Sequence, residues 1–100
     1  MTVFTRRLYE ARKLSGLSQE SLGIKAGLEE ASASTRMNRY EVGARMPDME
    51  LVERLAQVLN VPAAYFYADS DEVAWLLVTF HRMKPAERKA LIETARNLIA

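Results

Sequence analysis

Between Gly16 and Pro47 the sequence reads GLSQESLGIKAGLEEASASTRMNRYEVGARMP, and this stretch decides the fold that we predict for the chain. It contains two short amphipathic segments, each opened by small polar residues and closed by glycine. Ser18 is a good helix N-cap, and Gly16 and Gly43 suit the left-handed backbone that often follows a helix. The stretch therefore predicts two short helices joined by a turn.

The second segment, from about Glu30 to Val42, has an unusual exposed face. On a helical wheel of about 100° per residue, Ala33, Met37 and Tyr40 form the stripe that we expect to be buried. The positions opposite the stripe are polar: Ser32, Thr35, Asn38 and Arg39, with Arg36 on its flank. Ordinary solvated helix surfaces are richer in Glu and Lys. This face therefore indicates a helix that approaches a partner closely.

The first fifteen residues also predict a helix. Phe4, Leu8 and Ala11 repeat at helical spacing, with Leu14 or Ser15 completing the apolar side. The charged residues of this segment are expected to point outward: Arg6, Arg7, Glu10 and Lys13.

Helical patterns continue after Pro47, and no strand pattern or repeat occurs. Asp48 is expected to cap a fourth helix that ends at Asn60. Residues 61–67 predict a short fifth helix with Pro62 at its first position and aromatic side chains in the core. A sixth, unusually apolar helix is expected from Asp69–Asp71 to about Met83, and Lys84-Pro85 separates it from a seventh.

Composition favours an ordinary globular chain. It has 100 residues, of which 49% are hydrophobic and 27% charged, and it has no cysteine. Residues 1–46 carry eight Lys/Arg and five Asp/Glu (+3), whereas residues 47–100 carry six and eight (−2), an asymmetry that weakly favours an anionic partner for the first half. Because charged residues precede any apolar run and no long apolar segment follows, we expect a cytoplasmic protein without a membrane span.

Several motifs in fixed order resemble the lambda-repressor-like helix-turn-helix family, which includes regulators of the Cro/C1 and xenobiotic-response-element type. They are Ser18-Gln19-Glu20-x-Leu22, Ala26-Gly27, Arg39-Tyr40-Glu41-x-Gly43, Pro47 and Leu55-Ala56-x-x-Leu59-x-Val61. The resemblance covers residues from about Arg7 to Phe66. It implies an all-α fold: a compact five-helix DNA-binding domain, here residues 1–68, with two additional C-terminal helices in residues 69–100.

The resemblance also implies which residues bind double-stranded DNA. The recognition helix, around Ser32–Val42, would lie in the major groove. Residues matching its reading positions are Thr35, Arg36, Asn38 and Arg39, while Gln19 matches a glutamine that contacts the DNA backbone and braces the recognition helix, and Arg45 lies in a loop that meets phosphates. Arginine can pair bidentately with guanine and asparagine with adenine, which agrees with this assignment.

The chain departs from the shortest family members between Ala26-Gly27 and Arg39. About one extra helical turn, approximately Leu28 to Ser32, leaves the start of the recognition helix open within Leu28–Ser34. Gly23 stands where alanine is commoner, and we expect it to allow closer packing of the second and third helices.

Structural roles compete with DNA contact at two of these positions. Arg39 could instead form an ion pair with Glu10 or Glu41, and Gln19 also makes a serviceable start to a helix. Glu41 itself is expected to hold the scaffold, against Arg12 or Arg7. Arg6, Arg7, Lys13 and Lys25 are interpreted mainly as solvated surface.

Residues 69–100 are expected to form a helical hairpin with more apolar surface than one packed face uses. A homodimer that spaces two recognition helices is our main interpretation, a thicker core is the simpler one, and docking of another protein is the third. The overall prediction is a transcriptional regulator of bacterial or phage type, a dimeric repressor; the alternative is an antitoxin or phage-type switch protein. No catalytic residue, cofactor or metal site is expected, because His81 has no acid cluster or cysteine near it in the sequence.

Overall fold

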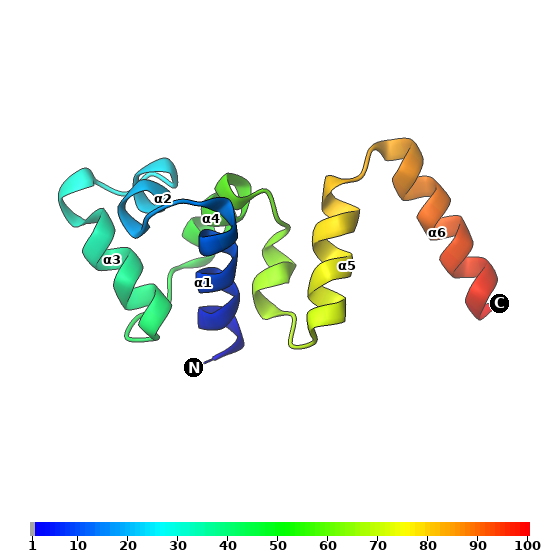
Figure 1. Cartoon of the computed structure of the whole chain (residues 1–100), viewed down its shortest axis with the longest axis horizontal. Coiled ribbons are helices and arrows are strands. Elements are labelled where there is room, and N and C mark those ends of the chain that lie inside the picture. Colours follow the sequence, from blue (N-terminus) through cyan, green and yellow to red (C-terminus); the bar gives the residue numbers. More distant parts are fainter. Residues whose placement is uncertain (1) are drawn as a thin grey trace.

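The computed structural model describes residues 2–100 and consists of helices throughout that range (Figure 1). The elements are α1 (Val3–Ser15), α2 (Gln19–Lys25), α3 (Glu30–Val42), α4 (Met49–Leu59), the 3₁₀ helix η1 (Ala63–Tyr67), α5 (Asp71–Arg82) and α6 (Pro85–Ile99). The predicted all-α fold class is confirmed.

Local capping chemistry sets the helix ends where the sequence predicted them. The Ser18 side chain accepts a hydrogen bond from the Ser21 amide, and Asp48 accepts from Leu51 in the same way. Gly16 and Gly43 both have positive φ, 75° and 81°, and end α1 and α3 in the left-handed conformation.

The fifth segment differs from its prediction. It is a 3₁₀ helix, and Pro62 is its N-cap with extended backbone rather than its first helical residue. Eleven residues, 60–70, link α4 to α5, and 3₁₀ geometry is common for a short helical piece within such a connection. The aromatic plug is confirmed for Tyr65 and Phe66, which are buried, whereas Tyr67 is half exposed.

A single hydrophobic core lies between α1, α2, α3, α4 and η1. Its largest fully buried side chains include one or more from each of these elements: Leu8, Leu22, Met37, Leu55 and Phe66. The rings of Phe4 and Phe66 lie 5.4 Å apart and tie α1 to η1.

The predicted faces of α1 are wrong at two positions. Arg7 is not surface, because its side chain is only 3% exposed; its Nε donates to the Ala68 carbonyl at 2.8 Å and its guanidinium pairs with Asp71 at 2.9 Å. Leu14 was expected on the apolar side but is 87% exposed. Arg7 is drawn inward because the turn after η1 presents carbonyls that need donors.

Helix α5 is part of the packed unit rather than of a separate hairpin. Ala74 is buried in the core, and Leu77 and Val78 pack against it. Arg82 closes the far end by donating to the Asn60 carbonyl at 3.0 Å. The expected division of the chain at residues 68 and 69 therefore does not coincide with a break in packing.

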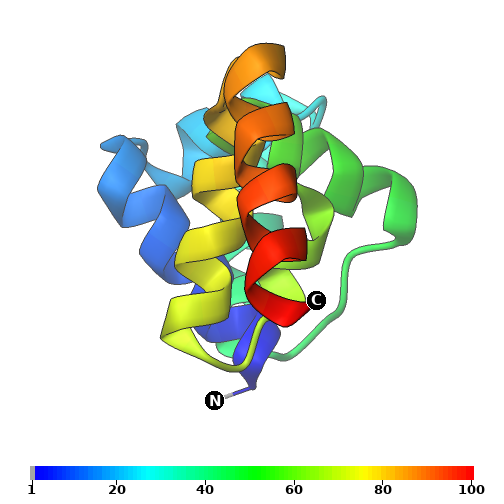
Figure 2. The same ribbon diagram turned by 90° about the vertical axis from the view of Figure 1, so that its right-hand side faces the viewer.

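Helix α6 stands apart from the rest of the molecule. None of its fifteen residues is buried, and in Figure 1 it diverges from α5 after the corner at Lys84-Pro85. Figure 2 views the molecule from this end and shows α6 in front of α5. The helical hairpin expected for residues 69–100 is thus an open one, with α6 at an angle to α5. Helix α3 lies at the other end of the long axis, along which the molecule extends 52 Å (Figure 1).

Candidate nucleic-acid interface

Helices α2 and α3 pack closely because Gly23 lies between them. A Cβ atom at this position would lie 3.0 Å from both the Ala33 Cβ and the Met37 Cγ, which is tighter than ordinary contact. The closer packing expected from Gly23 is therefore confirmed, and it fixes how α3 is presented.

Helix α3 exposes the polar face that the helical wheel predicted. Ala33, Met37 and Tyr40 are buried. The residues expected to read DNA are all exposed, and we call them the reading face: Thr35, Arg36, Asn38 and Arg39. The helix begins at Glu30, so Glu30 to Ser32 of the extra segment belong to it, while Leu28 and the N-cap Glu29 precede it.

Gln19 on α2 connects the reading face to a buried ion pair. Its Nε2 donates to Asn38 Oδ1 at 3.2 Å and lies 3.3 Å from Glu41 Oε1. Glu41 is only 4% exposed and is held by Arg12, whose Nε and Nη2 donate to its two oxygens at 2.6 and 3.0 Å. These hydrogen bonds raise the pKa of the Arg12 guanidinium, against the opposing effect of its burial. The expectation that Glu41 holds the scaffold is confirmed for Arg12, not Arg7.

Arg36, Arg39 and Arg45 gather around a shallow hollow that Tyr40 also lines, and we call it the arginine hollow. Arg36 Nη2 donates to the Tyr40 hydroxyl at 3.1 Å, so one wall is held in place. None of the three arginines forms an ion pair within residues 2–100. The alternative partners of Arg39 are engaged elsewhere, because Glu41 binds Arg12 and Glu10 binds Arg6 and Arg7.

Three cations around one hollow without carboxylate partners form a surface suited to anions. Guanidinium groups match phosphate and base edges bidentately. The structure thus brings together all six predicted site residues at one end of the molecule: Gln19 and Asn38 hydrogen-bonded to each other, Arg36, Arg39 and Arg45 around the hollow, and Thr35 on the exposed side of α3.

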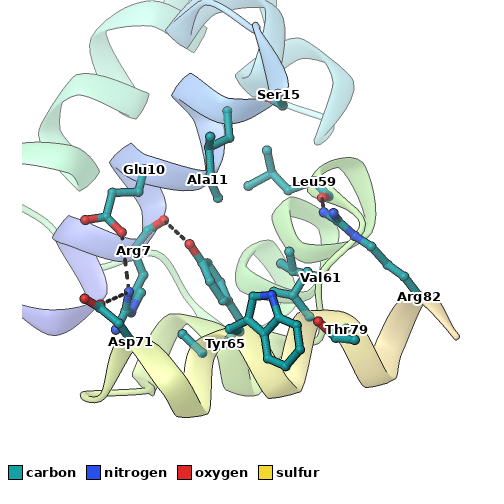
Figure 3. A pocket seen from close by; sticks show the side chains of 14 residues that line it. Arg7, Glu10, Ala11, Ser15, Leu59, Val61, Tyr65, Asp71, Thr79 and Arg82 are labelled. Atoms are coloured by element: carbon teal, nitrogen blue, oxygen red, sulfur yellow. Dashed lines mark hydrogen bonds and ion pairs between the residues drawn. The ribbon is translucent and has the colours of Figure 1, made fainter. Parts of the chain in front are cut away.

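Sequence reasoning missed a second hollow, the groove of about 540 Å³ between α1 and α5 (Figure 3). Its floor consists of Leu59, Val61 and Tyr65, and Figure 3 shows Arg7 reaching across to Asp71. Hydrogen bonds from Arg7 and then Arg6 lower the pKa of Asp71, while burial raises the pKa of the Tyr65 hydroxyl. Arg6 and Arg7 of α1 thus pair with Asp71 of α5, and these ion pairs attach α5 to α1. The buried Arg7 had no signal in the sequence beyond its position next to the apolar stripe.

Two features of other protein classes are absent from residues 2–100. No group of three or more acidic or histidine side chains in that range could hold a metal ion. No helix in the same range is long and apolar enough to cross a membrane.

Comparison with known proteins agrees with this geometry. A family model described as helix-turn-helix matches residues 8–66, more than half of the chain. The chain belongs to the Cro/C1-type helix-turn-helix family. This family consists of DNA-binding transcriptional regulators, and the matched range includes all six predicted site residues.

Two curated relatives support the same membership. Uncharacterized HTH-type transcriptional regulators from Sinorhizobium medicae (strain WSM419) and Rhizobium meliloti (strain 1021) are each 30% identical over 64 residues. The alignment covers 64% of this chain and 43% of each relative, so the matched part is less than half of those proteins.

A solved structure extends the similarity to the C-terminal helices. The crystal structure of transcriptional regulator BswR is 41% identical and superimposes with a TM-score of 0.86, covering 93% of this chain and 92% of that one. Coverage of that extent includes most of residues 67–100, which lie outside the family model.

Proposed function

We propose that the chain is a sequence-specific DNA-binding transcriptional regulator that acts as a dimeric repressor and places α3 in the major groove. The observation that carries this proposal is the reading face with the adjoining arginine hollow, where Asn38 is positioned by Gln19 and the three arginines of the hollow lack carboxylate partners within residues 2–100. A face with those properties is poorly suited to a core and well suited to a polyanion.

The residues divide into two kinds of contact. Asn38 and Arg39 lie on the side of α3 away from the core, where adenine and guanine edges would be met, and Thr35 adds a slim hydroxyl. Arg36 and Arg45 on the arginine hollow suit phosphate oxygens. Gln19 holds the Asn38 carbonyl oxygen, which leaves the Asn38 NH₂ to donate to the DNA.

We infer repression from the proposed placement of α3. A protein whose α3 lies in the major groove occupies the DNA site and excludes other proteins from it, which is the simplest way to repress transcription. Dimerisation is supported by the exposed apolar side chains of the C-terminal helices, among them Trp75 at 65% exposed and Leu98 at 81%.

Selection from a pool of random DNA duplexes tests the proposal. We expect enrichment of one pseudo-palindromic sequence, with affinity falling steeply as salt rises because bound cations release counterions. The Asn38→Ala and Arg39→Ala variants should each lose about 1–3 kcal/mol of discrimination at one base position. Because neither residue supports the core, both variants should melt close to the parent.

Lys89→Ala is the matched control, because it removes an exposed cation from α6, far from α3. It should leave the selected sequence and its affinity nearly unchanged. Absence of any enriched sequence at low salt would contradict the proposal, and a large drop in the melting temperature of Asn38→Ala or Arg39→Ala would show that the residue is structural.

A protein-binding role, as in antitoxins or phage-type switch proteins, is the alternative. Helix α6 favours it, because no residue of that helix is buried and its apolar side chains are free to meet another protein. Capture of one partner that depends on residues 69–100, without any selected DNA sequence, would favour this function.

A further inference from the structure

Helix α6 carries an apolar stripe that residues 2–100 leave largely uncovered: Leu91 is partly buried and the rest of the stripe is exposed. On a helical wheel, Arg88 and five apolar residues fall within about 60° of Ala95, and the apolar ones are Leu91, Ile92, Ala95, Leu98 and Ile99. Leu98 and Ile99 are 81% and 88% exposed. An isolated helix of this length is marginal in water, so this stripe needs a surface to pack against.

Helix α5 also exposes apolar side chains next to α6. Ala74 points into the core, while Val73 and Leu76 lie about 60° apart on one side of the helix, and we call them the outer face. Phe80, whose ring lies under the guanidinium of Arg88 from α6, falls between them on the helical wheel. Val73 and Leu76 are about half exposed, whereas Trp75 lies on the other flank and lines the groove between α1 and α5. The stripe of α6 and the outer face of α5 are thus both apolar and lie next to the same corner, and neither covers the other.

Hydrogen bonds fix the corner between the two helices. Arg88 donates to the carbonyls of Phe80 and His81 at 3.0 and 2.6 Å, and its guanidinium lies over the Phe80 ring at 5.3 Å. Glu87 accepts from the Lys84 amide at 2.8 Å. The corner is therefore built from specific contacts at the last turn of α5, and it holds α6 at an angle to its own α5.

We propose that a second copy of the chain supplies the missing cover: α6 of each chain packs its apolar stripe on the outer face of the partner's α5. This arrangement rests on the dimer in the proposed function and states how that dimer forms. One two-fold axis then relates the two contacts between α6 and the partner's α5, because each copy offers the same stripe and the same outer face. The result is a bundle of four helices with its apolar side chains inside.

Charge and register agree with this exchange. In the exchange, the partner's α6 takes the antiparallel position that α6 of the same chain would occupy in a closed hairpin. Counting outward from the corner at residues 83 and 84 then brings the partner's Leu91 level with Leu76 and its Arg96 beside Glu72. Asp71 and Glu72 make the start of α5 acidic, while Arg96 is the basic residue in the last turn of α6. The partner's α6 would thus bring a cation to an acidic helix start, where opposite charges attract.

Engineered cysteines test the exchange directly, because the chain has none of its own. In a Leu76→Cys/Leu91→Cys double variant, mild oxidation should give a covalent dimer of twice the mass on a denaturing gel. The matched control, Leu76→Cys/Asn97→Cys, places the second thiol on the opposite side of α6 and should form at least tenfold less covalent dimer. A product of single-chain mass would show that α6 closes on its own α5 and would overturn the proposal.

Sedimentation of a stripe variant gives a second, independent test. Leu98→Glu should convert the dimer to a monomer, a twofold lower mass, while helix content stays near that of the parent because Leu98 is already exposed in the single chain. Asn97→Glu is its control and should remain dimeric. A parent chain that is monomeric at tens of micromolar would overturn the exchange and assign the stripe to a different protein.

These outcomes separate the exchange from the DNA-reading function. Neither the cross-link nor the sedimentation experiment involves DNA. A monomer that still selects a half-site would refute the exchange alone, whereas an exchanged dimer without sequence preference would refute the proposed function alone.

Discussion

Replacing Arg12 by methionine would leave the Glu41 carboxylate buried, with Gln19 as its remaining side-chain donor at 3.3 Å. Glu41 is 4% exposed and now receives two hydrogen bonds from Arg12. Removing one partner of a buried ion pair typically costs about 3–5 kcal/mol, because the other charge stays desolvated. For a domain of this size each kilocalorie lowers the melting temperature by about 4–8 °C, so we expect a loss of roughly 12 °C or more.

Urea and thermal unfolding, followed by circular dichroism, measure this effect. Lys13→Met is the matched control: it removes the neighbouring, exposed cation and should change the free energy of unfolding by less than about 0.5 kcal/mol. The double variant Arg12→Met/Glu41→Leu removes both charges and should recover most of the stability, since apolar replacements of buried pairs are often neutral.

The same variant has a functional consequence below its melting temperature. Glu41 helps to hold Gln19, and Gln19 holds Asn38, so Arg12→Met should also weaken base preference at the position that Asn38 reads. If Arg12→Met loses less than about 1 kcal/mol, or if the double variant is no more stable than the single one, the pair is not what supports the reading face.

Two further predictions concern helix packing. Gly23→Ala should destabilise the fold by about 1 kcal/mol or more, because the new Cβ meets Ala33 at 3.0 Å and outweighs the usual helix preference for alanine; a rise in melting temperature, against Lys25→Ala as control, would contradict this. Asp71 has a pKa lowered by Arg7 and then Arg6, so its stabilising contribution is complete above the unfolded-state pKa of about 3.9 and is lost as pH falls through the folded-state value. Melting curves from pH 7 to pH 2 should show the difference between the parent and Asp71→Asn shrink below about pH 4, and a constant difference would refute the assignment.

Helix ends could be predicted because the chemistry that sets them is local. A hydroxyl or carboxylate at Ser18 or Asp48 reaches an amide three residues away, and a glycine at Gly43 adopts positive φ without strain. The reading face is local in the same sense, since one helical period decides which side chains point away from Met37.

What could not be predicted depends on contacts between distant segments. Arg7 is buried because the turn after η1, more than sixty residues later, brings carbonyls to it. The bond from Gln19 to Asn38 likewise needs the packing angle that Gly23 allows. The open angle of α6 depends on Arg88 reaching back to the end of α5, which no periodicity encodes.

The position of α6 constrains how the proposed dimer binds DNA. Helices α3 and α6 lie at opposite ends of a molecule 52 Å long (Figure 1). A two-fold axis that passes beside α6 therefore leaves the reading face at the end of each chain that is farthest from the axis. Two recognition helices one DNA turn apart are separated by ~34 Å. Because each reading face lies no more than 52 Å from the axis, that separation requires the long axes of the two chains to diverge by roughly 40° or more. Axes that diverge much further would carry the reading faces to half-sites two or more turns apart. The half-site spacing in the selected DNA therefore reports the angle between the long axes of the two chains. It links the packing of α6 in the dimer to the choice of operator.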